Sequence, residues 1–231
     1  MNRVPRWLTV IVLLIGGAPH AAAQDDGPGL RPHHLTVSGG LSLNGGYPVG
    51  DRNAELRRNA VGTPAAFTLF RADSILDRAS GVEARIGFAL TRALAIEVGG
   101  TYARPRLDIT ISRDSESTES VQVAEQLSQF TVDVSGVFQL PRVALGSRMR
   151  PYAAVGAGYL RQLHEDRLLV ETGRIYHVGG GVRYWLRGGS ATSRALGVRG
   201  DARYVRRTGG VDFENRSRGY PVVSILGFAG F

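Results

Sequence analysis

The sequence predicts an all-β fold, an eight-stranded antiparallel up-and-down transmembrane β-barrel. Three observations predict it. Apolar and polar residues alternate with a period of two in eight segments, short and long connections alternate between those segments, and charged residues avoid the apolar face of the strands. Strands of about ten residues are long enough to cross a bilayer at a tilt.

The beginning of the chain predicts export. Arg3 and Arg6 precede an apolar run from Leu8 to Ile15, and the small residues Ala21 and Ala23 mark a cleavage site. The apolar run is shorter than the ~20 residues that a membrane-spanning helix needs. We therefore expect a signal peptide at 1–23, an N-terminal lead at 24–32 and an outer-membrane barrel at 33–231.

The first four strands are predicted from clear alternation. Leucine and valine alternate with threonine and serine from Leu35 to Leu43, and apolar residues alternate with glutamate and arginine from Val82 to Leu90. The same pattern runs from Leu94 to Tyr102 and from Phe130 to Leu140. Each segment therefore has one apolar and one polar face.

The last four strands contain more glycine. Small residues occupy both faces of Pro151–Leu160, and three consecutive glycines lie within Tyr176–Leu186, where they ease curvature and packing. Arginine and aspartate alternate with apolar residues in Leu196–Tyr204, and Gly219–Phe231 closes the chain.

The connections predict how the strands are arranged. Three of them are short, at Thr91–Ala93, Pro141–Ser147 and Arg187–Arg194, and four are mostly longer, at Gly46–Arg78, Arg104–Glu125, His164–Arg174 and Arg206–Arg218. Short turns on the periplasmic side and longer loops outside are typical of an outer-membrane barrel.

Two of these loops predict structure of their own. In loop 46–78, Asp51–Ala60 predicts a short helix capped by Asp51, and Ala65–Arg71 predicts a strand above the membrane. In loop 104–125, strand-prone stretches flank a polar tip and predict a projecting hairpin. Both loops are candidate surfaces for an unknown ligand, and surface variability without a ligand is the alternative.

Charged residues in the strands lie opposite the apolar stripe. These residues are Glu83, Arg85, Glu97, Asp133, Arg183, Arg199, Asp201 and Arg203. Four acids and four arginines give a neutral interior, and eight strands enclose only enough space for side chains to fill. We therefore expect a salt-bridged core, with a narrow or gated conduit as the alternative. A soluble barrel with its charged face in water is a further alternative.

Tyrosines on the apolar face favour a membrane-spanning barrel over a soluble one. Tyr102, Tyr176 and Tyr204 lie at the predicted outer ends of their strands, and Tyr184 lies at an inner end. Tyr176 and Tyr184 are eight residues apart in the sequence. That spacing is about 26 Å at ~3.3 Å per residue. These residues predict an aromatic girdle at both membrane interfaces.

Composition limits the chemistry. The 231 residues contain no cysteine, which excludes thiol catalysis and cysteine-ligated metals. No serine lies at short spacing from His164, His177 is expected to be a polar core residue, and the adjacent His33 and His34 of a strand point to opposite faces. We expect no catalytic site, metal or cofactor, with a lipid-modifying enzyme as the less favoured alternative.

All 28 basic residues are arginine, and the formal net charge is +8, or +6 without the signal peptide. An exported protein does not ordinarily meet nucleic acid. Because the strand charges cancel, the excess must lie mainly on loops and turns. The predicted partners are outer-membrane lipid and its anionic lipopolysaccharide.

Three segments carry a resemblance to a known family: LTRALAIEVGGTYAR, RPYAAVGAGY and the terminal VVSILGFAGF. Together they resemble the small outer-membrane proteins of the OmpA-transmembrane, OmpX and opacity-protein type. The resemblance implies the outer membrane as location, and Phe231 as the C-terminal signal that the barrel-assembly machinery reads. Tyr220 and Phe228 lie on the other parity, which leaves the facing of the last strand open. The function implied is structural or surface-interaction, with a small porin-like channel as the alternative.

Overall fold

The computed structural model describes residues 32–56, 67–112, 120–140, 148–165, 168–187, 195–214 and 216–231. Eight strands form a barrel: β1 (Leu35–Asn44), β4 (Ala79–Ala89), β5 (Leu94–Ala103), β8 (Ser128–Gln139), β9 (Met149–Leu163), β10 (Val170–Arg187), β11 (Ala195–Gly209) and β12 (Arg218–Gly230). Four strands form a second sheet: β2 (Tyr47–Leu56), β3 (Phe67–Leu76), β6 (Arg106–Ser112) and β7 (Val121–Gln126). The predicted signal peptide at 1–23, with Ala21 and Ala23, lies outside the described residues.

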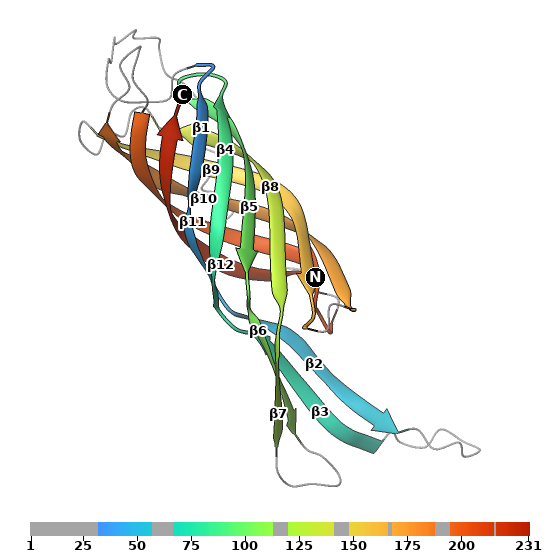
Figure 1. Ribbon diagram of the computed structural model, residues 1–231. Coiled ribbons are helices and arrows are strands. Elements are labelled where there is room, and N and C mark those ends of the chain that lie inside the picture. Colours follow the sequence, from blue (N-terminus) through green and yellow to red (C-terminus); the bar gives the residue numbers. More distant parts are fainter. Residues whose placement is uncertain are drawn as a thin grey trace, which may run out of the picture.

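The barrel closes through its first strand. The order is β1-β12-β11-β10-β9-β8-β5-β4, and β1 pairs antiparallel with β4 on one side and β12 on the other (Figure 1). The other neighbours follow the order of the sequence, as in an up-and-down barrel. The predicted all-β, eight-stranded antiparallel barrel is therefore confirmed. No helix in the described ranges is long and apolar enough to cross a bilayer.

The two ends of the barrel differ. The β4–β5 turn and the C-terminus lie at one end, the turn end, where the backbone N–H of Phe231 donates to the carbonyl of Leu35 over 2.9 Å. At the other end, the loop end, the second sheet projects beyond the barrel wall (Figure 1). We call β2, β3, β6 and β7 the extension sheet.

The extension sheet continues two pairs of barrel strands. Its order is β2-β3-β6-β7, and β1 leads into β2 through Gly45 and Gly46. Strands β6 and β7 pair antiparallel from Arg106↔Gln126 to Ile111↔Val121, so the predicted projecting hairpin is present. The predicted strand at Ala65–Arg71 is present from Phe67 onward.

The predicted helix at Asp51–Ala60 is wrong over its described part. Residues 51–56 belong to β2, and 57–60 lie outside the described residues. Asp51 caps nothing here, because its carboxylate pairs with Arg71 of β3 at 3.0 Å. Register shifts near Gly50, whose φ is +131°, and at Ala54 adjust β2 to β3. Cross-strand pairing has overridden a local helix preference.

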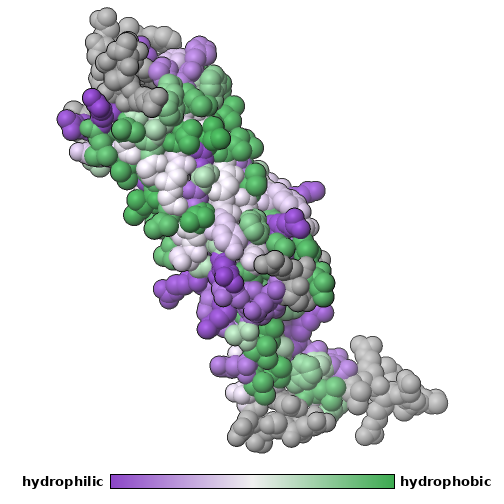
Figure 2. Space-filling model, in the orientation of Figure 1, coloured by the Kyte–Doolittle hydropathy of each residue, from purple (hydrophilic) through white to green (hydrophobic). Residues whose placement is uncertain are grey.

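The barrel wall has inverted polarity. Outward side chains such as Leu41, Val82 and Ile225 are more than half exposed, whereas inward charged side chains are buried. Figure 2 shows apolar side chains over the barrel wall, and hydrophilic ones gathered where the wall meets the extension sheet. Apolar side chains on the outside of a barrel are stable in contact with lipid acyl chains, so this arrangement is suited to a bilayer.

The three-glycine stretch of β10 is required by close packing. A Cβ on Gly181 would lie 2.6 Å from the hydroxyl oxygen of Tyr152 and closer still to the carbonyl oxygen of Gly200. A Cβ on Gly200 of the adjacent β11 would meet no atom within 4 Å. Close packing therefore requires glycine at position 181 but not at position 200.

We predict that Gly181→Ala lowers the free energy of unfolding by about 1–3 kcal/mol, because the added methyl group overpacks the barrel interior. Gly200→Ala is the matched control, since its methyl group enters open space. Urea unfolding of both variants in lipid vesicles checks the difference. Equal stability of the two variants would contradict the packing argument.

Candidate functional site

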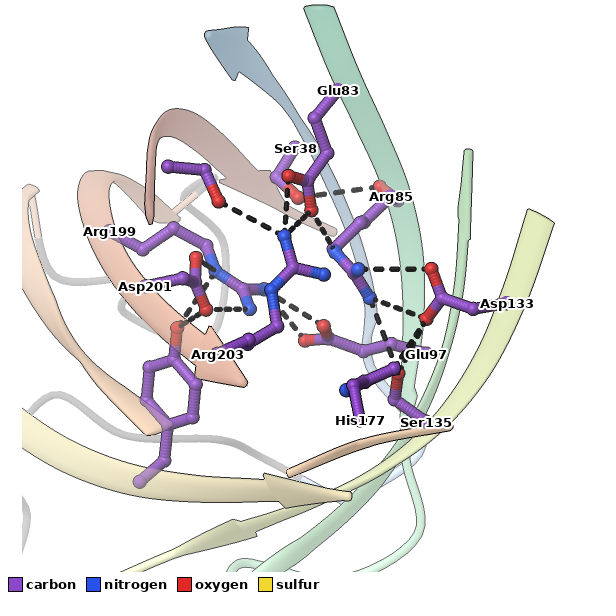
Figure 3. A network of polar contacts seen from close by, with 12 residues as sticks. Ser38, Glu83, Arg85, Glu97, Asp133, Ser135, His177, Arg199, Asp201 and Arg203 are labelled. Atoms are coloured by element: carbon purple, nitrogen blue, oxygen red, sulfur yellow. Dashed lines mark hydrogen bonds and ion pairs between the residues drawn. The ribbon is translucent and has the colours of Figure 1, made fainter. Parts of the chain in front are cut away.

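The structure brings all eight predicted strand charges together inside the barrel. None exposes more than 8% of its surface. They come from β4, β5, β8, β10 and β11, and Figure 3 shows seven of them, all but Arg183, pointing toward one another across the interior. We call this set the charged layer: Glu83, Arg85, Glu97, Asp133, Arg183, Arg199, Asp201 and Arg203.

One half of the charged layer is centred on Arg85 and Glu83. Arg85 donates from Nε to Glu83 over 2.5 Å, and from both terminal nitrogens to Asp133 over 3.1 and 3.2 Å. Arg203 donates to both carboxylate oxygens of Glu83 over 2.5 and 2.6 Å, and to Ser224 over 3.1 Å. Each carboxylate here faces at least one guanidinium.

The other half is centred on Glu97, which accepts from two arginines. Arg183 donates to it over 2.5 Å and Arg199 over 2.8 and 3.0 Å. Arg199 also donates to Asp201 over 2.9 and 3.0 Å, and the hydroxyl of Tyr152 donates to the same carboxylate. Both guanidiniums lie 5.1 Å from the centre of the Tyr152 ring. Cation–π contact adds to the ion pairs.

His177 contacts the charged layer, and the geometry of its contacts differs from that of a Ser–His–acid relay. Its Nε2 lies 3.1 Å from Asp133 and 3.3 Å from Ser135, and Ser135 donates to Asp133 over 2.8 Å. A serine nucleophile needs one imidazole nitrogen for the serine and the other for the acid. Here one nitrogen meets both residues, and Nδ1 has no partner in the described part of the chain.

An apolar layer covers the charged layer at the loop end. It contains Tyr47, Val49, Leu76, Leu107, Leu127, Leu160, Ile175, Val205, Val211, Tyr220 and Val222. Tyr47 and Tyr220 stack with their ring centres 4.9 Å apart. A cavity of about 20 Å³ separates the two layers, lined in part by Asp133, His177 and Tyr220. That volume accommodates about one water molecule.

Arg207, which the alternation pattern did not predict as an interior residue, lies within this apolar layer. Only 1% of its surface is exposed, and its guanidinium lies 4.7 Å from the centre of the Tyr47 ring. It donates to Gln162 over 3.0 Å and to the backbone carbonyl of Val211. Arg207 lies on the inward parity of β11, which continues to Gly209, whereas the predicted strand ends at Tyr204.

The turn end is also closed by side chains, and this settles the facing of the last strand. Trp185 and Phe228 are buried and meet edge to face at 5.6 Å. Tyr220 is buried as well, whereas Val223, Ile225 and Phe231 are exposed. Residues of even number in β12 therefore point inward.

The predicted aromatic girdle lies on the outside of the barrel. Tyr176, Tyr184 and Tyr204 are exposed, and Tyr102 is half-buried against Phe130, with ring centres 4.7 Å apart. Tyr184 lies toward the turn end and the other three tyrosines lie toward the loop end. Aromatic rings thus flank the apolar belt on both sides.

An apolar wall around a paired charged interior is the arrangement of an outer-membrane barrel. The barrel is built to span a membrane. No protein-family model and no curated protein matches the sequence. Among solved structures, the outer membrane protein OprG from Pseudomonas aeruginosa is similar, with a TM-score of 0.49 and 11% identity over 88% of this chain and 98% of that one.

Two further solved barrels are similar to this chain. Ail, the attachment invasion locus protein of Yersinia pestis, has a TM-score of 0.41 and 10% identity over 87% of this chain and 99% of that one. The outer membrane protease OmpT from Escherichia coli has a TM-score of 0.30 and 12% identity, covering 85% and 94%.

The other histidines that the structure describes lie outside the charged layer. His164 pairs with Glu125 at 2.8 Å beside the extension sheet, and His33 lies 6.3 Å from the Phe88 ring at the turn end. Within the described ranges, no three histidine or acidic side chains gather as a metal site would need.

The connection between β11 and β12 carries a small ion-pair cluster outside the membrane. Arg218 donates to Asp212 over 3.0 Å and to Glu214 over 2.9 Å. Hydrogen bonding with Asp51, and then with Arg218, lowers the pKa of Glu214 below its ordinary value. The cluster ties this connection to β2, where Arg218 also donates to the carbonyl of Val49.

We predict that Glu97→Ala lowers the free energy of unfolding by about 3–5 kcal/mol, because it removes the carboxylate that Arg183 and Arg199 share. Urea unfolding followed by fluorescence of the buried Trp185 measures the loss. Asp73→Ala, which breaks an exposed pair with Arg71, serves as control and should cost less than about 1 kcal/mol. Equal losses would contradict the charged layer's role.

Proposed function

We propose that this chain is an integral outer-membrane barrel that conducts no ions and acts in a structural or surface-interaction role through its extension sheet. The observation that carries the proposal is the filled interior. The charged layer, the apolar layer and the Trp185–Phe228 contact occupy successive levels of the barrel.

The filled interior argues against a channel. An ion crossing the barrel would have to displace guanidinium–carboxylate contacts of 2.5 to 3.2 Å. It would then have to enter an apolar layer in which Leu76, Leu107 and Leu160 are at most 2% exposed. Breaking buried ion pairs and dehydrating an ion in apolar surroundings are both costly.

The extension sheet supports the surface role. Rows of paired residues place Ile109 and Ile111 of β6 beside Val123 and Val121 of β7. At its base this apolar face joins the core through Leu76 and Leu107, but at β7 the two valines remain about half exposed. Strand β7 pairs only with β6, so its other edge is open within the described residues. An open edge with apolar side chains favours pairing with an extended segment of a protein partner.

The interior histidine has no catalytic role in this function. Ser135 donates to Asp133, and His177 contacts that same carboxylate through the nitrogen that faces the serine. His177 then acts as a polar core residue. Loss of a lipid modification in cells carrying His177→Gln, with the barrel folded, would contradict this part of the proposal.

We expect the folded protein to give no stable ion-sized conductance steps in planar bilayers. Folding of the same sample is verified separately by heat-modifiable migration on a detergent gel. A lack of conductance steps then cannot be explained by a lack of folded protein. Stable steps from folded protein would contradict the filled-interior argument and favour the porin-like alternative.

The surface role requires the extension sheet to face the cell exterior. Because the chain lacks cysteine, a single introduced thiol reports its own location. We expect Val123→Cys to react with a membrane-impermeant maleimide on intact cells, whereas Thr91→Cys, in the exposed β4–β5 turn, reacts only after permeabilisation. The reverse pattern would overturn the orientation, and labelling of neither thiol after permeabilisation would overturn membrane display.

A further inference from the structure

Outward-facing tyrosine and arginine occur two residues apart at the loop end of four barrel strands. The pairs are Tyr102 and Arg104 at β5, Tyr159 and Arg161 on β9, Tyr176 and Arg174 on β10, and Tyr204 and Arg206 on β11. The order in the sequence is reversed in β10, which runs in the opposite direction to the other three. The arginine is therefore always the residue closer to the loop end.

Pairing between strands joins these residues into one continuous surface. Phe130 lies opposite Arg161, Tyr159 opposite Arg174, and Tyr176 opposite Arg206. Directly paired residues of antiparallel strands project from the same face, with Cβ atoms about 4.5–5.5 Å apart. We call this surface the arginine–aromatic band: Arg161, Arg174, Arg206, Phe130, Tyr159 and Tyr176.

The three arginines of the band are uncompensated. All three are exposed, and none forms an ion pair or side-chain hydrogen bond with a residue that the structure describes. No acidic residue occupies an outward position in the described strands β8, β9, β10 and β11. The band therefore presents a charge of +3.

Several other arginines at this end form ion pairs. Arg71 pairs with Asp51 and Asp73, Arg106 with Asp77 and Asp108, and Arg218 with Asp212 and Glu214. These pairs neutralise the three arginines, whereas Arg161, Arg174 and Arg206 keep their full charge on one side of the barrel wall. Such a surface fits an anionic partner rather than an internal structural role.

The surroundings of the band identify the kind of anion. Val132 and Val178 are the next outward-facing residues toward the turn end after Phe130 and Tyr176, and both are more than half exposed. The apolar surface of the barrel continues from these valines toward the turn end. A ligand that meets both surfaces has an anionic head and an apolar tail. Guanidinium groups bind phosphate oxygens through paired N–H donors, and aromatic rings are favoured at the headgroup level of a bilayer.

We propose that the arginine–aromatic band binds the phosphate groups of an anionic outer-leaflet glycolipid, namely lipopolysaccharide. This inference rests on the proposed outer-membrane location. The three guanidiniums hold the phosphates at the membrane surface, while the acyl chains lie against the valines below. The band makes β8 to β11 the lipid-selective side of the barrel.

The test uses the full mature chain, folded in detergent micelles, with lipid A as the probe. Each arginine near an anionic lipid surface contributes about fivefold to affinity, so Arg161→Gln/Arg174→Gln/Arg206→Gln is expected to bind about 100-fold more weakly. The control Arg52→Gln/Arg71→Gln/Arg106→Gln removes the same charge from the extension sheet and should bind as the wild type does. Replacement of the three band arginines by lysine should recover part of the affinity, because charge is kept but paired donation is lost.

Two further binding measurements test whether the phosphate groups are recognised and whether they must belong to a lipid. Dephosphorylated lipid A should bind the wild type as weakly as lipid A binds the glutamine variant, and inorganic phosphate should compete poorly because it lacks the acyl chains. Equal binding of both lipids, equal loss in the control variant, or full competition by inorganic phosphate would each overturn the inference.

Heat-modifiable migration and thiol labelling on intact cells separate this inference from the proposed function. If the glutamine variant folds, inserts and binds lipid A as the wild type does, the band has no lipid role and the surface-display proposal stands. If the wild type itself does not insert into the membrane, the outer-membrane proposal is overturned, and the lipid-binding inference that rests on it is overturned with it.

Discussion

The pairing of buried charges is the constraint on which the rest of this structure depends. Eight strands leave too little room for water around ionised groups, so each carboxylate inside must meet a guanidinium. That requirement constrains the register of strands that are not neighbours, since Glu97 of β5 must reach Arg183 of β10 and Arg199 of β11 across the interior at once. It also explains why glycine is placed at Gly99 and Gly181, where a Cβ would collide with Arg85 or with Tyr152.

The apolar layer links the barrel to the extension sheet. Tyr47 and Val49 of β2, Leu76 of β3 and Leu107 of β6 are buried with residues of the barrel strands. The base of the sheet is therefore part of the barrel core. Because this packing anchors the sheet, its far strand can remain open without detaching from the molecule.

Alternation was sufficient to predict the barrel and its charged layer. A strand has only two faces. Because one face of each barrel strand contacts lipid, charged residues such as Glu83, Asp133 and Arg203 must lie on the other face, inside the barrel. Alternation could not predict which acid meets which arginine, because register depends on all eight strands together. Nor could it predict that β2 would replace the helix expected from Asp51, since that outcome depends on pairing with a strand more than ten residues away. Arg207 was missed because the strand continues beyond its predicted end, and the arginine–aromatic band was missed because its parts meet only across strands.

The distribution of the interior charges along the chain has a consequence for assembly. The first four members, Glu83, Arg85, Glu97 and Asp133, sum to −2, and the last four, Arg183, Arg199, Asp201 and Arg203, sum to +2. Contacts such as Glu83–Arg203 join residues 120 positions apart. Neither half can neutralise itself, so a nascent N-terminal half carries unmatched acids until the C-terminal hairpins arrive. Closure of the barrel therefore requires both halves, because only then does every carboxylate of the charged layer meet a guanidinium.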